Sequence, residues 1–402
     1  MAPTIVTDAL AALNASSVVL DPMSGSGTVL AIAQSRGHRA IGMDVDPLAV
    51  LIAKVWGTPL RHSVVFSEAT TVLQQAREWF AVLPQSQAYP VGADEETRAF
   101  LRYWFDGYSR RQLAALVCAL NCLPNSPVKN ALWCAVSRMI ITKQAGVSLA
   151  RDLSHSRPHR AYDVAPKKPF KLFPEAVRRT LEGILEEDMA SDTPRMSVRR
   201  GDARRMSLAE DSVDLVFTSP PYLNAIDYLR CSKFALVWMG FRISELRQIR
   251  SDSIGAEVGV ADTAELRVIQ DLGIGALLSP RTQAVLRRYI SDMRQVMSEV
   301  ARVLRPGAKA IYVVGENTIR GTYVPTGEIV TQVARECGLR LHEKHFRMLP
   351  SNRRYLPPPG DSSNRNALDA RMRREVVITF GKTESPSPTV DASDDSCHLL
   401  PV

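Results

Sequence analysis

The sequence predicts an α/β protein in which a doubly wound sheet is interrupted by a large helical insertion. Strands and helices alternate over the first 55 residues, as at the start of such a sheet. Helical periodicity then dominates residues 59–194, and the alternation resumes near residue 196. These observations divide the chain into four parts: a first core segment at 1–57, a helical insertion at 58–195, a second core segment at 196–382 and a tail at 383–402.

The first core segment opens with a short helix over about residues 4–14 and a buried strand that ends at Asp21. A Gly-rich turn, MSGSGT, follows this strand and leads into a helix. Gly25 and Gly27 allow positive φ and a close approach of the backbone to a ligand, and the helix start offers free N–H groups. The next strand brings Asp44 to its end, where a carboxylate can bind a ribose diol.

The charged residues at the Gly-rich turn indicate which kind of adenosine ligand it could bind. The turn lacks the phosphate-binding lysine of a P-loop, and the carboxylate of Asp21 would repel a pyrophosphate. A cationic or zwitterionic adenosine ligand therefore fits the turn better than a nucleotide.

The insertion carries four predicted helices, at residues 95–105, 109–123, 126–144 and 174–189. Ser109 and Ser126 are the expected N-caps of the second and third helices, and Pro127 occupies a first helical position.

The second core segment continues the alternation of strands and helices. Residues 282–304 repeat apolar side chains at helical spacing, which predicts a long amphipathic helix ended by an Arg-Pro-Gly turn. Strands are expected at residues 196–199, 213–217, 309–314, 339–347 and 375–380, and a second helix at 328–337. After Lys382 no lysine or arginine occurs, and we expect a disordered acidic tail.

A second motif, TSPPY, follows the strand at 213–217. Pro220 and Pro221 fix φ and remove backbone donors, so the chain is stiff here and its carbonyls can accept hydrogen bonds. Tyr222 supplies a flat face next to them. A rigid acceptor beside a stacking platform suits a planar ring that carries an exocyclic amine.

Together, DPMSGSGT and TSPPY resemble the S-adenosylmethionine-dependent DNA amino-methyltransferases, the cytosine-N4 and adenine-N6 group. The similarity is greatest to the cytosine-N4 enzymes, whose catalytic motif typically begins with Ser rather than Asp or Asn. The matches cover less than half of the chain. They imply a seven-stranded class I methyltransferase sheet, which is Rossmann-like, and S-adenosyl-L-methionine as the cofactor.

The resemblance also implies roles for individual residues. The cofactor's methionine part would lie against Asp21, Asp44 would hold the ribose, and Asp202 would contact the adenine amine. The residues implied in cofactor binding are Asp21, Pro22, Gly25, Ser26, Gly27, Thr28, Asp44 and Asp202. The residues implied in catalysis are Ser219, Pro220, Pro221 and Tyr222.

Composition points to a polyanionic partner. The chain has 402 residues, 45% hydrophobic and 23% charged, enough for one large domain with an insertion or for two domains. Its net charge of +8 favours nucleic acid. No segment approaches the length of a membrane span and the N-terminus carries no targeting pattern, so we expect a soluble cytoplasmic or nucleoid-associated protein.

Two basic stretches are candidate nucleic-acid contacts. The first, residues 151–171, is expected to be a surface loop, with a solvated linker as the alternative. The second, residues 350–374, joins the last two strands, and we expect it to emerge at the carboxyl edge of the sheet. The residues expected to contact DNA are Arg157, Arg160, Lys167, Lys168, Arg353, Arg354 and Tyr355.

The sequence thus favours a site-specific DNA methyltransferase that modifies the exocyclic amine of a flipped base, with cytosine N4 favoured by Ser219. The partner would be double-stranded DNA, together with a restriction endonuclease or a defence-system subunit. Three alternatives stay open: an adenine-N6 enzyme, an RNA base-amine methyltransferase, and a catalytically decayed DNA-binding subunit. None of the six cysteines follows a proline, which argues against a cytosine-C5 enzyme, and their spacing favours no metal site.

Overall fold

The fold is built on one mixed seven-stranded sheet. The computed structural model describes residues 3–142, 145–151, 158–186, 196–223, 229–255, 264–275, 278–319, 322–348 and 374–382. The strand order is β10-β11-β7-β6-β1-β2-β5. The strands are β1 (Val18–Asp21), β2 (Arg39–Asp44), β5 (Met196–Arg200), β6 (Val213–Thr218), β7 (Leu304–Gly315), β10 (Leu339–Met348) and β11 (Arg374–Lys382).

The order of the strands confirms the predicted doubly wound sheet. β1 pairs in parallel with both β2 and β6, β5 extends the parallel pairing on one side and β7 on the other. The chain therefore leaves β1 in two directions, and β6 meets β1 at the position where a ligand crevice is expected in open α/β sheets. β11 is antiparallel to both β7 and β10.

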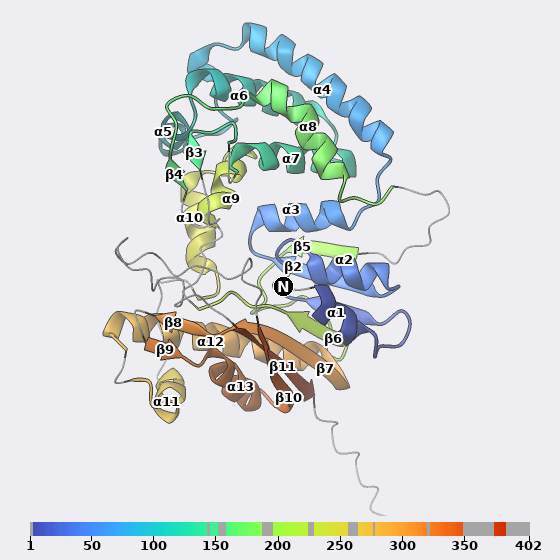
Figure 1. The fold of residues 1–402 in the computed structure, drawn as a ribbon, viewed down its shortest axis with the longest axis vertical. Coiled ribbons are helices and arrows are strands. Elements are labelled where there is room, and N and C mark those ends of the chain that lie inside the picture. Colours follow the sequence, from blue (N-terminus) through green and yellow to red (C-terminus); the bar gives the residue numbers. More distant parts are fainter. Residues whose placement is uncertain are drawn as a thin grey trace, which may run out of the picture.

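Helices cover both faces of the sheet because its central strands are apolar on both sides (Figure 1). Val19 and Leu215 face one helical layer, and Leu20 and Val216, their neighbours in the chain, face the other. The first layer comprises α1 (Pro3–Leu10), α2 (Thr28–Ser35) and α3 (Pro47–Trp56). The second comprises α12 (Pro280–Val303) and α13 (Thr326–Glu336).

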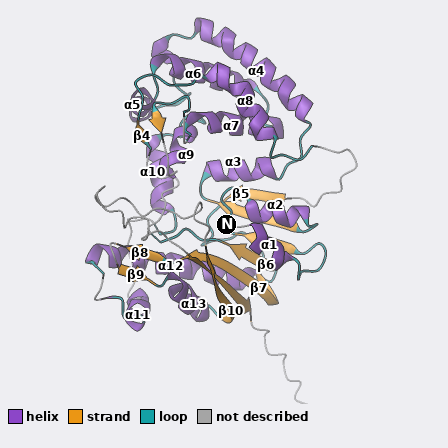
Figure 2. Cartoon of the chain, in the orientation of Figure 1, coloured by secondary structure: helices purple, strands orange, loops and turns teal. Residues whose placement is uncertain are grey.

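A second mass of helices stands beside the sheet, and Figure 2 shows that it consists almost wholly of helix. The insertion contributes α4 (His62–Val82), the short η1 (Gln85–Gln87), α5 (Glu95–Trp104), α6 (Gly107–Cys122), α7 (Pro127–Ile140) and α8 (Pro169–Leu181). The second core segment adds α9 (Leu229–Leu236) and α10 (Ile243–Asp252), whose Phe234 and Leu246 join the same apolar cluster. Smaller elements are β3 (Ala150–Arg151), β4 (His159–Arg160), α11 (Ala264–Asp271), β8 (Asn317–Ile319) and β9 (Thr322–Val324).

The helix starts of the insertion confirm one predicted cap and correct another. Ser126 caps α7, its hydroxyl accepting from the Lys129 N–H at 3.1 Å, and Pro127 follows at the first helical position. The N-cap of α6 is Asp106 and not Ser109, because the Asp106 carboxylate accepts from both the N–H and the hydroxyl of Ser109, at 2.8 and 3.0 Å. Ser109 therefore lies inside the first turn of the helix.

The helix predicted at residues 174–189 was placed too late. α8 begins at Pro169, where a missing N–H costs nothing, and the Gln112 side chain accepts from the next N–H, that of Phe170, at 3.3 Å. Pro174 lies inside this helix, which ends at Leu181.

The basic stretch at residues 151–171 was predicted as a loop and is only partly one. Its described residues include the β3–β4 pairing and the first residues of α8. Arg157 lies outside the described residues, as do Arg353, Arg354 and Tyr355 of the second stretch and the tail. The ends of that second stretch are described: Met348 pairs with Arg374, and β10 runs parallel to β7 because both are antiparallel to β11. In the part of the chain that the structure describes, no helix combines the length and apolar character that crossing a membrane requires.

Candidate active site

Three hydrogen bonds fix the segment that follows β6, each to a different strand. The Thr218 hydroxyl donates to Asp21 Oδ1 of β1 at 2.8 Å. The Ser219 hydroxyl donates to the Val313 carbonyl of β7 at 3.0 Å, and the Tyr222 hydroxyl donates to Glu375 Oε1 of β11 at 2.7 Å. We call residues 218–222 the catalytic loop, after the role that we propose for it below. These bonds place the loop at the carboxyl edge of the sheet, next to the Gly-rich turn.

Asp21 joins the two sequence motifs. Its carboxylate is 2% exposed, and Oδ1 accepts from both the Thr218 hydroxyl and the Met23 N–H, the latter at 3.2 Å. Burial raises the pKa of Asp21 to about 7, against the lowering effect of these hydrogen bonds. A cation bound beside this carboxyl would favour its ionised form.

The Gly-rich turn folds back onto the end of β2. The Gly25 N–H donates to Asp44 Oδ2 at 2.8 Å, and the Ser24 N–H donates to the Met43 carbonyl at 2.9 Å. Gly27 has φ +84°, and a Cβ there would lie 2.8 Å from the Ala53 Cβ, so this position requires glycine. Pro22, Ser26 and Thr28 complete the turn, and α2 starts at Thr28. The predicted residues of the first core segment are therefore brought together at one edge.

Asp44 lies at the end of β2, as predicted, and it also holds the turn. Oδ2 accepts from Gly25, and Oδ1 accepts from the Asp46 N–H at 2.9 Å. Each carboxylate oxygen has a second acceptor position, so these bonds leave capacity for a ligand hydroxyl. Burial raises the pKa of Asp44 to about 6, although the hydrogen bonds from Asp46 and Gly25 act in the opposite direction.

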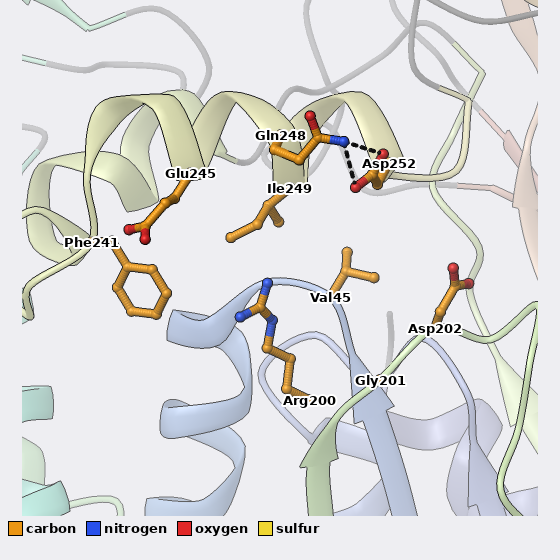
Figure 3. A pocket seen from close by; sticks show the side chains of 9 residues that line it. All are labelled: Val45, Arg200, Gly201, Asp202, Phe241, Glu245, Gln248, Ile249 and Asp252. Carbon is orange, nitrogen blue, oxygen red and sulfur yellow. Dashed lines mark hydrogen bonds between the residues drawn. The ribbon is translucent and has the colours of Figure 1, made fainter.

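A pocket with a volume of about 660 Å³ lies next to Asp44, between the ends of β2 and β5 and helix α10 (Figure 3). Val45 and Ile249 face each other across it, while Arg200, Glu245 and Asp252 supply charge. The complete lining is Val45, Arg200, Gly201, Asp202, Phe241, Glu245, Gln248, Ile249 and Asp252. The α10 wall was not anticipated from the sequence.

Asp202 lies in this pocket, as its match to the adenine-binding acid implies, but it carries a tight ion pair. Arg204 Nη2 lies 2.8 Å from Asp202 Oδ2, and Arg204 Nε lies 3.0 Å from Oδ1. Burial acts to raise the pKa of Asp202, yet the Arg204 hydrogen bonds outweigh it and hold the pKa below its usual value. Asp202 is therefore a fixed anion at neutral pH.

Arg204 also fixes the wall opposite the sheet. Its Nη1 lies 2.6 Å from Asp292 Oδ1 on α12, and its Nη2 donates to the Asp252 carbonyl at the end of α10, at 2.5 Å. Arg288, from α12, donates to the Ser251 carbonyl at 3.0 Å. The pocket wall is thus held by an ion-pair network that the sequence motifs did not reveal.

The predicted DNA-contacting residues that the structure describes lie on the helical mass, away from the sheet edge. Arg160, on β4, stacks on the Tyr103 ring with 5.3 Å between guanidinium carbon and ring centre. Lys168, at the start of α8, lies 3.8 Å from Asp106 and 5.5 Å from the Tyr108 ring centre. Lys167 precedes it. Arg160 and Lys168 thus lie beside exposed aromatic rings on the helical mass, and the structure does not bring them to the catalytic loop.

Comparisons with known proteins give distant relatives. No family model matches the chain. It is similar to the type II methyltransferase M.MvaI of Kocuria varians, with 21% identity over 390 residues that cover 89% of this chain and 83% of the relative. It is also similar to M.AvaI of Anabaena variabilis, with 23% identity over 414 residues covering 90% and 80%, and to M.BsoBI of Geobacillus stearothermophilus, with 20% identity covering 82% and 74%. The chain is thus a distant homologue of type II DNA methyltransferases.

A solved SAM-dependent methyltransferase of Methanosarcina mazei is 10% identical, and the match covers 96% of this chain and 99% of that one with a TM-score of 0.35. At this TM-score the similarity adds nothing to the strand order described above.

Proposed function

We propose that the chain is an S-adenosylmethionine-dependent DNA methyltransferase that modifies the N4 amine of cytosine. The observation that carries the proposal is the 2.8 Å bond between Thr218 and Asp21. It joins the acceptor-and-ring loop to the acidic Gly-rich turn at one sheet edge, so a methyl donor held by the turn would face the loop. Distant homology to type II DNA methyltransferases supports methyl transfer to DNA. The choice of cytosine N4 rests on Ser219 at the start of the loop motif.

The turn and the pocket have the groups that the cofactor needs. The buried Asp21 carboxyl would take the ammonium of the methionine part, and the open space at Gly25 leaves the backbone accessible. Asp44 would bind the ribose diol. The adenine would enter the pocket between Val45 and Ile249, with Asp202 accepting from its amine. When bound, the cofactor supplies an electrophilic methyl group.

The catalytic loop would hold the target amine in line with that methyl. Because the Ser219 hydroxyl donates to Val313, its lone pairs point elsewhere and can accept from the amine. The Pro220 carbonyl is a second acceptor. Such fixed acceptors localise the nitrogen lone pair and stabilise the positive charge that develops on nitrogen. Tyr222 would stack on the base, which must leave the duplex to reach the loop, at a cost of a few kcal/mol.

The DNA would be held mainly through its phosphates. The net charge of +8 suits a polyanion. We assign phosphate contacts to Arg160, Lys167 and Lys168, and to the cations outside the described residues, Arg157, Arg353 and Arg354, with Tyr355 beside them. A cognate restriction endonuclease is the proposed biological partner.

Labelled methyl transfer tests this proposal. The protein is incubated with S-adenosylmethionine labelled in its methyl group and with duplex DNA or RNA, and label is counted in each polymer. We expect label in DNA alone, and none with Ser219→Ala. Label in RNA alone would support the RNA alternative. Cofactor binding by calorimetry without transfer to either polymer would support the decayed subunit.

A further inference from the structure

We infer that Glu375 is a positioning residue that fixes the ring of Tyr222 for catalysis. The inference rests on the proposed function and adds a residue that lies in neither sequence motif. The Tyr222 hydroxyl donates to Glu375 Oε1 at 2.7 Å, and this bond joins positions 153 residues apart in the chain. Glu375 is the second residue of β11.

The sheet holds the Glu375 backbone rigidly. Residue 375 pairs with Arg347 of β10 on one side and with Gly315 of β7 on the other. Its carboxylate therefore projects from a strand that is hydrogen-bonded on both edges. The β-ladder gives the Tyr222 hydroxyl an acceptor whose position is set independently of the catalytic loop.

Burial strengthens the Glu375 carboxylate as an acceptor for the Tyr222 hydroxyl. Glu375 is 3% exposed, and a carboxylate that is buried so deeply needs hydrogen bonds and a nearby cation. Arg347 Nη1 lies 3.4 Å from Glu375 Oε2, a distance within ion-pair range but without hydrogen-bond geometry. The bond from Tyr222 is consequently the short, charge-assisted contact of this carboxylate.

The hydrogen bond between Tyr222 and Glu375 controls the orientation of the tyrosine ring. Tyr222 follows two prolines, so its backbone is stiff, and the hydroxyl lies at the far end of the side chain. Fixing both ends restricts the rotation of the ring. A stacking platform that is already oriented spares the enzyme the entropy of ordering it when the base arrives. Glu375 would therefore act on turnover and leave cofactor affinity unchanged.

Four variants and one control test this role. Tyr222→Phe and Glu375→Ala each remove the bond, their combination tests whether the two act as one unit, and Glu375→Gln keeps an acceptor for the hydroxyl. The matched control is Tyr323→Phe, because the Tyr323 hydroxyl donates to Glu316 in a second Tyr–Glu pair that lies off the catalytic loop. Turnover on duplex DNA, KM for DNA and cofactor affinity are measured for each.

We expect Tyr222→Phe and Glu375→Ala to lower kcat by roughly 10- to 100-fold, as for loss of a hydrogen bond to a charged group. The double variant should lose no more than either single variant, because the two changes break one contact. Glu375→Gln keeps a neutral acceptor in place of the charged one, so it should lose less kcat than Glu375→Ala. Tyr323→Phe should stay within about threefold of wild-type kcat. Cofactor affinity should be unchanged throughout.

Wild-type kcat in Tyr222→Phe would overturn the inference, and this variant keeps the ring, so misfolding cannot hide the result. Additive losses in the double variant would mean that the Tyr222 hydroxyl and Glu375 act separately, which also overturns it. If the wild-type protein transfers no methyl group at all, the proposed function fails instead, so the two failures are distinguishable.

Discussion

The catalytic loop and the pocket proposed for the adenosine part of the cofactor occupy the same edge of one sheet, yet they are held in different ways. Thr218, Ser219 and Tyr222 each donate to an acceptor on a strand, at 2.8, 3.0 and 2.7 Å. The pocket has only one wall of strand ends, and its other wall, α10, comes from the helical mass. The sheet therefore sets the position of the catalytic loop, where we propose that the methyl acceptor binds.

The cofactor's adenine end depends on how α10 is tied to the core. Arg204 and Arg288 make that connection through the backbone carbonyls at the end of α10 and through Asp292. A working site must be held to within about 0.5 Å, and the catalytic loop is anchored directly to the sheet, whereas α10 is tied to the core through the Arg204 and Arg288 side chains. Mutations in the catalytic loop should consequently lower turnover. Mutations in the pocket should lower cofactor affinity or stability.

The largest effect is expected at the catalytic loop. Ser219→Ala and Tyr222→Ala should lower the methyl-transfer rate by at least ~100- to 1,000-fold, because each removes a group that acts on the target base. Cofactor affinity by calorimetry should stay within about threefold of wild type, since neither side chain belongs to the turn or the pocket. A parallel loss of cofactor affinity would show that the loop and the pocket are not separable.

Arg204→Met should destabilise the pocket wall. It leaves Asp292, whose side chain is 5% exposed, without its hydrogen-bonded guanidinium. We expect a loss of about 3 kcal/mol in the free energy of unfolding, the low end for breaking a buried pair, since Arg288 and the Gly255 N–H remain beside Asp292. Arg199→Met, at an exposed arginine of β5, is the control and should change stability by less than about 0.5 kcal/mol. An equal loss of stability in Arg204→Met and Arg199→Met would mean that the ion pairs of Arg204 do not hold α10 to the core.

Asp21→Asn should separate stability from cofactor binding. The folded pKa of about 7 lies above the reference value of 3.8, so between these values the folded protein keeps a proton that the unfolded chain has released. Stability therefore falls as pH rises through this window and is constant above it. Asparagine can accept both hydrogen bonds made to Oδ1, and it should flatten this slope and raise stability at pH 8 by roughly a few kcal/mol.

The same substitution should weaken the cofactor, because the methionine ammonium loses its counter-charge. In the wild-type protein, cofactor affinity should rise between pH 6 and pH 8, as Asp21 ionises. Thermal melts across this pH range and calorimetry at its two ends measure the two effects. An affinity that falls with rising pH would contradict the placement of the ammonium at Asp21.

Asp44→Ala should lower cofactor affinity by roughly 10- to 100-fold, since it removes the proposed ribose acceptor and releases the Gly25 N–H. DNA affinity, measured without cofactor, should be unaffected. Asp163→Ala, at an exposed carboxylate near β4, provides an acidic control. A loss of DNA binding in Asp44→Ala alone would mean that this end of the site also contacts DNA.

The smallest effects are expected on the helical mass. Arg160→Ala and Lys168→Ala should each weaken DNA binding by only a few fold and lower the slope of log affinity against log salt by about 1, as for single phosphate contacts. Titrations at several salt concentrations measure this. An unchanged salt dependence in both variants would place the DNA away from β4 and the start of α8.

The sheet was predictable because its signals are local. Apolar runs and glycine turns gave the strands and their edge, and Asp21, Asp44 and Ser219 lie where those patterns placed them. The capping of α6 was misassigned because Asp106 and Ser109 are both good caps and only the fold decides between them.

Long-range contacts explain what the sequence did not reveal. Glu375 is one acid before an apolar strand, and nothing local indicates that Tyr222 donates to it. Arg204 follows Asp202 closely, but its bonds to α10 and α12 depend on segments that are 48 and 88 residues away. Such partners become visible only when the sheet order is known.

Mass spectrometry of nucleosides identifies the base that the protein methylates. DNA methylated by the protein is digested to nucleosides, and the modified base is identified against standards. We expect N4-methylcytosine from the wild-type protein and none from Ser219→Ala. N6-methyladenine would keep the chemistry of the loop and correct the base, whereas 5-methylcytosine, or no methylated nucleoside from a protein that binds the cofactor, would contradict the claim.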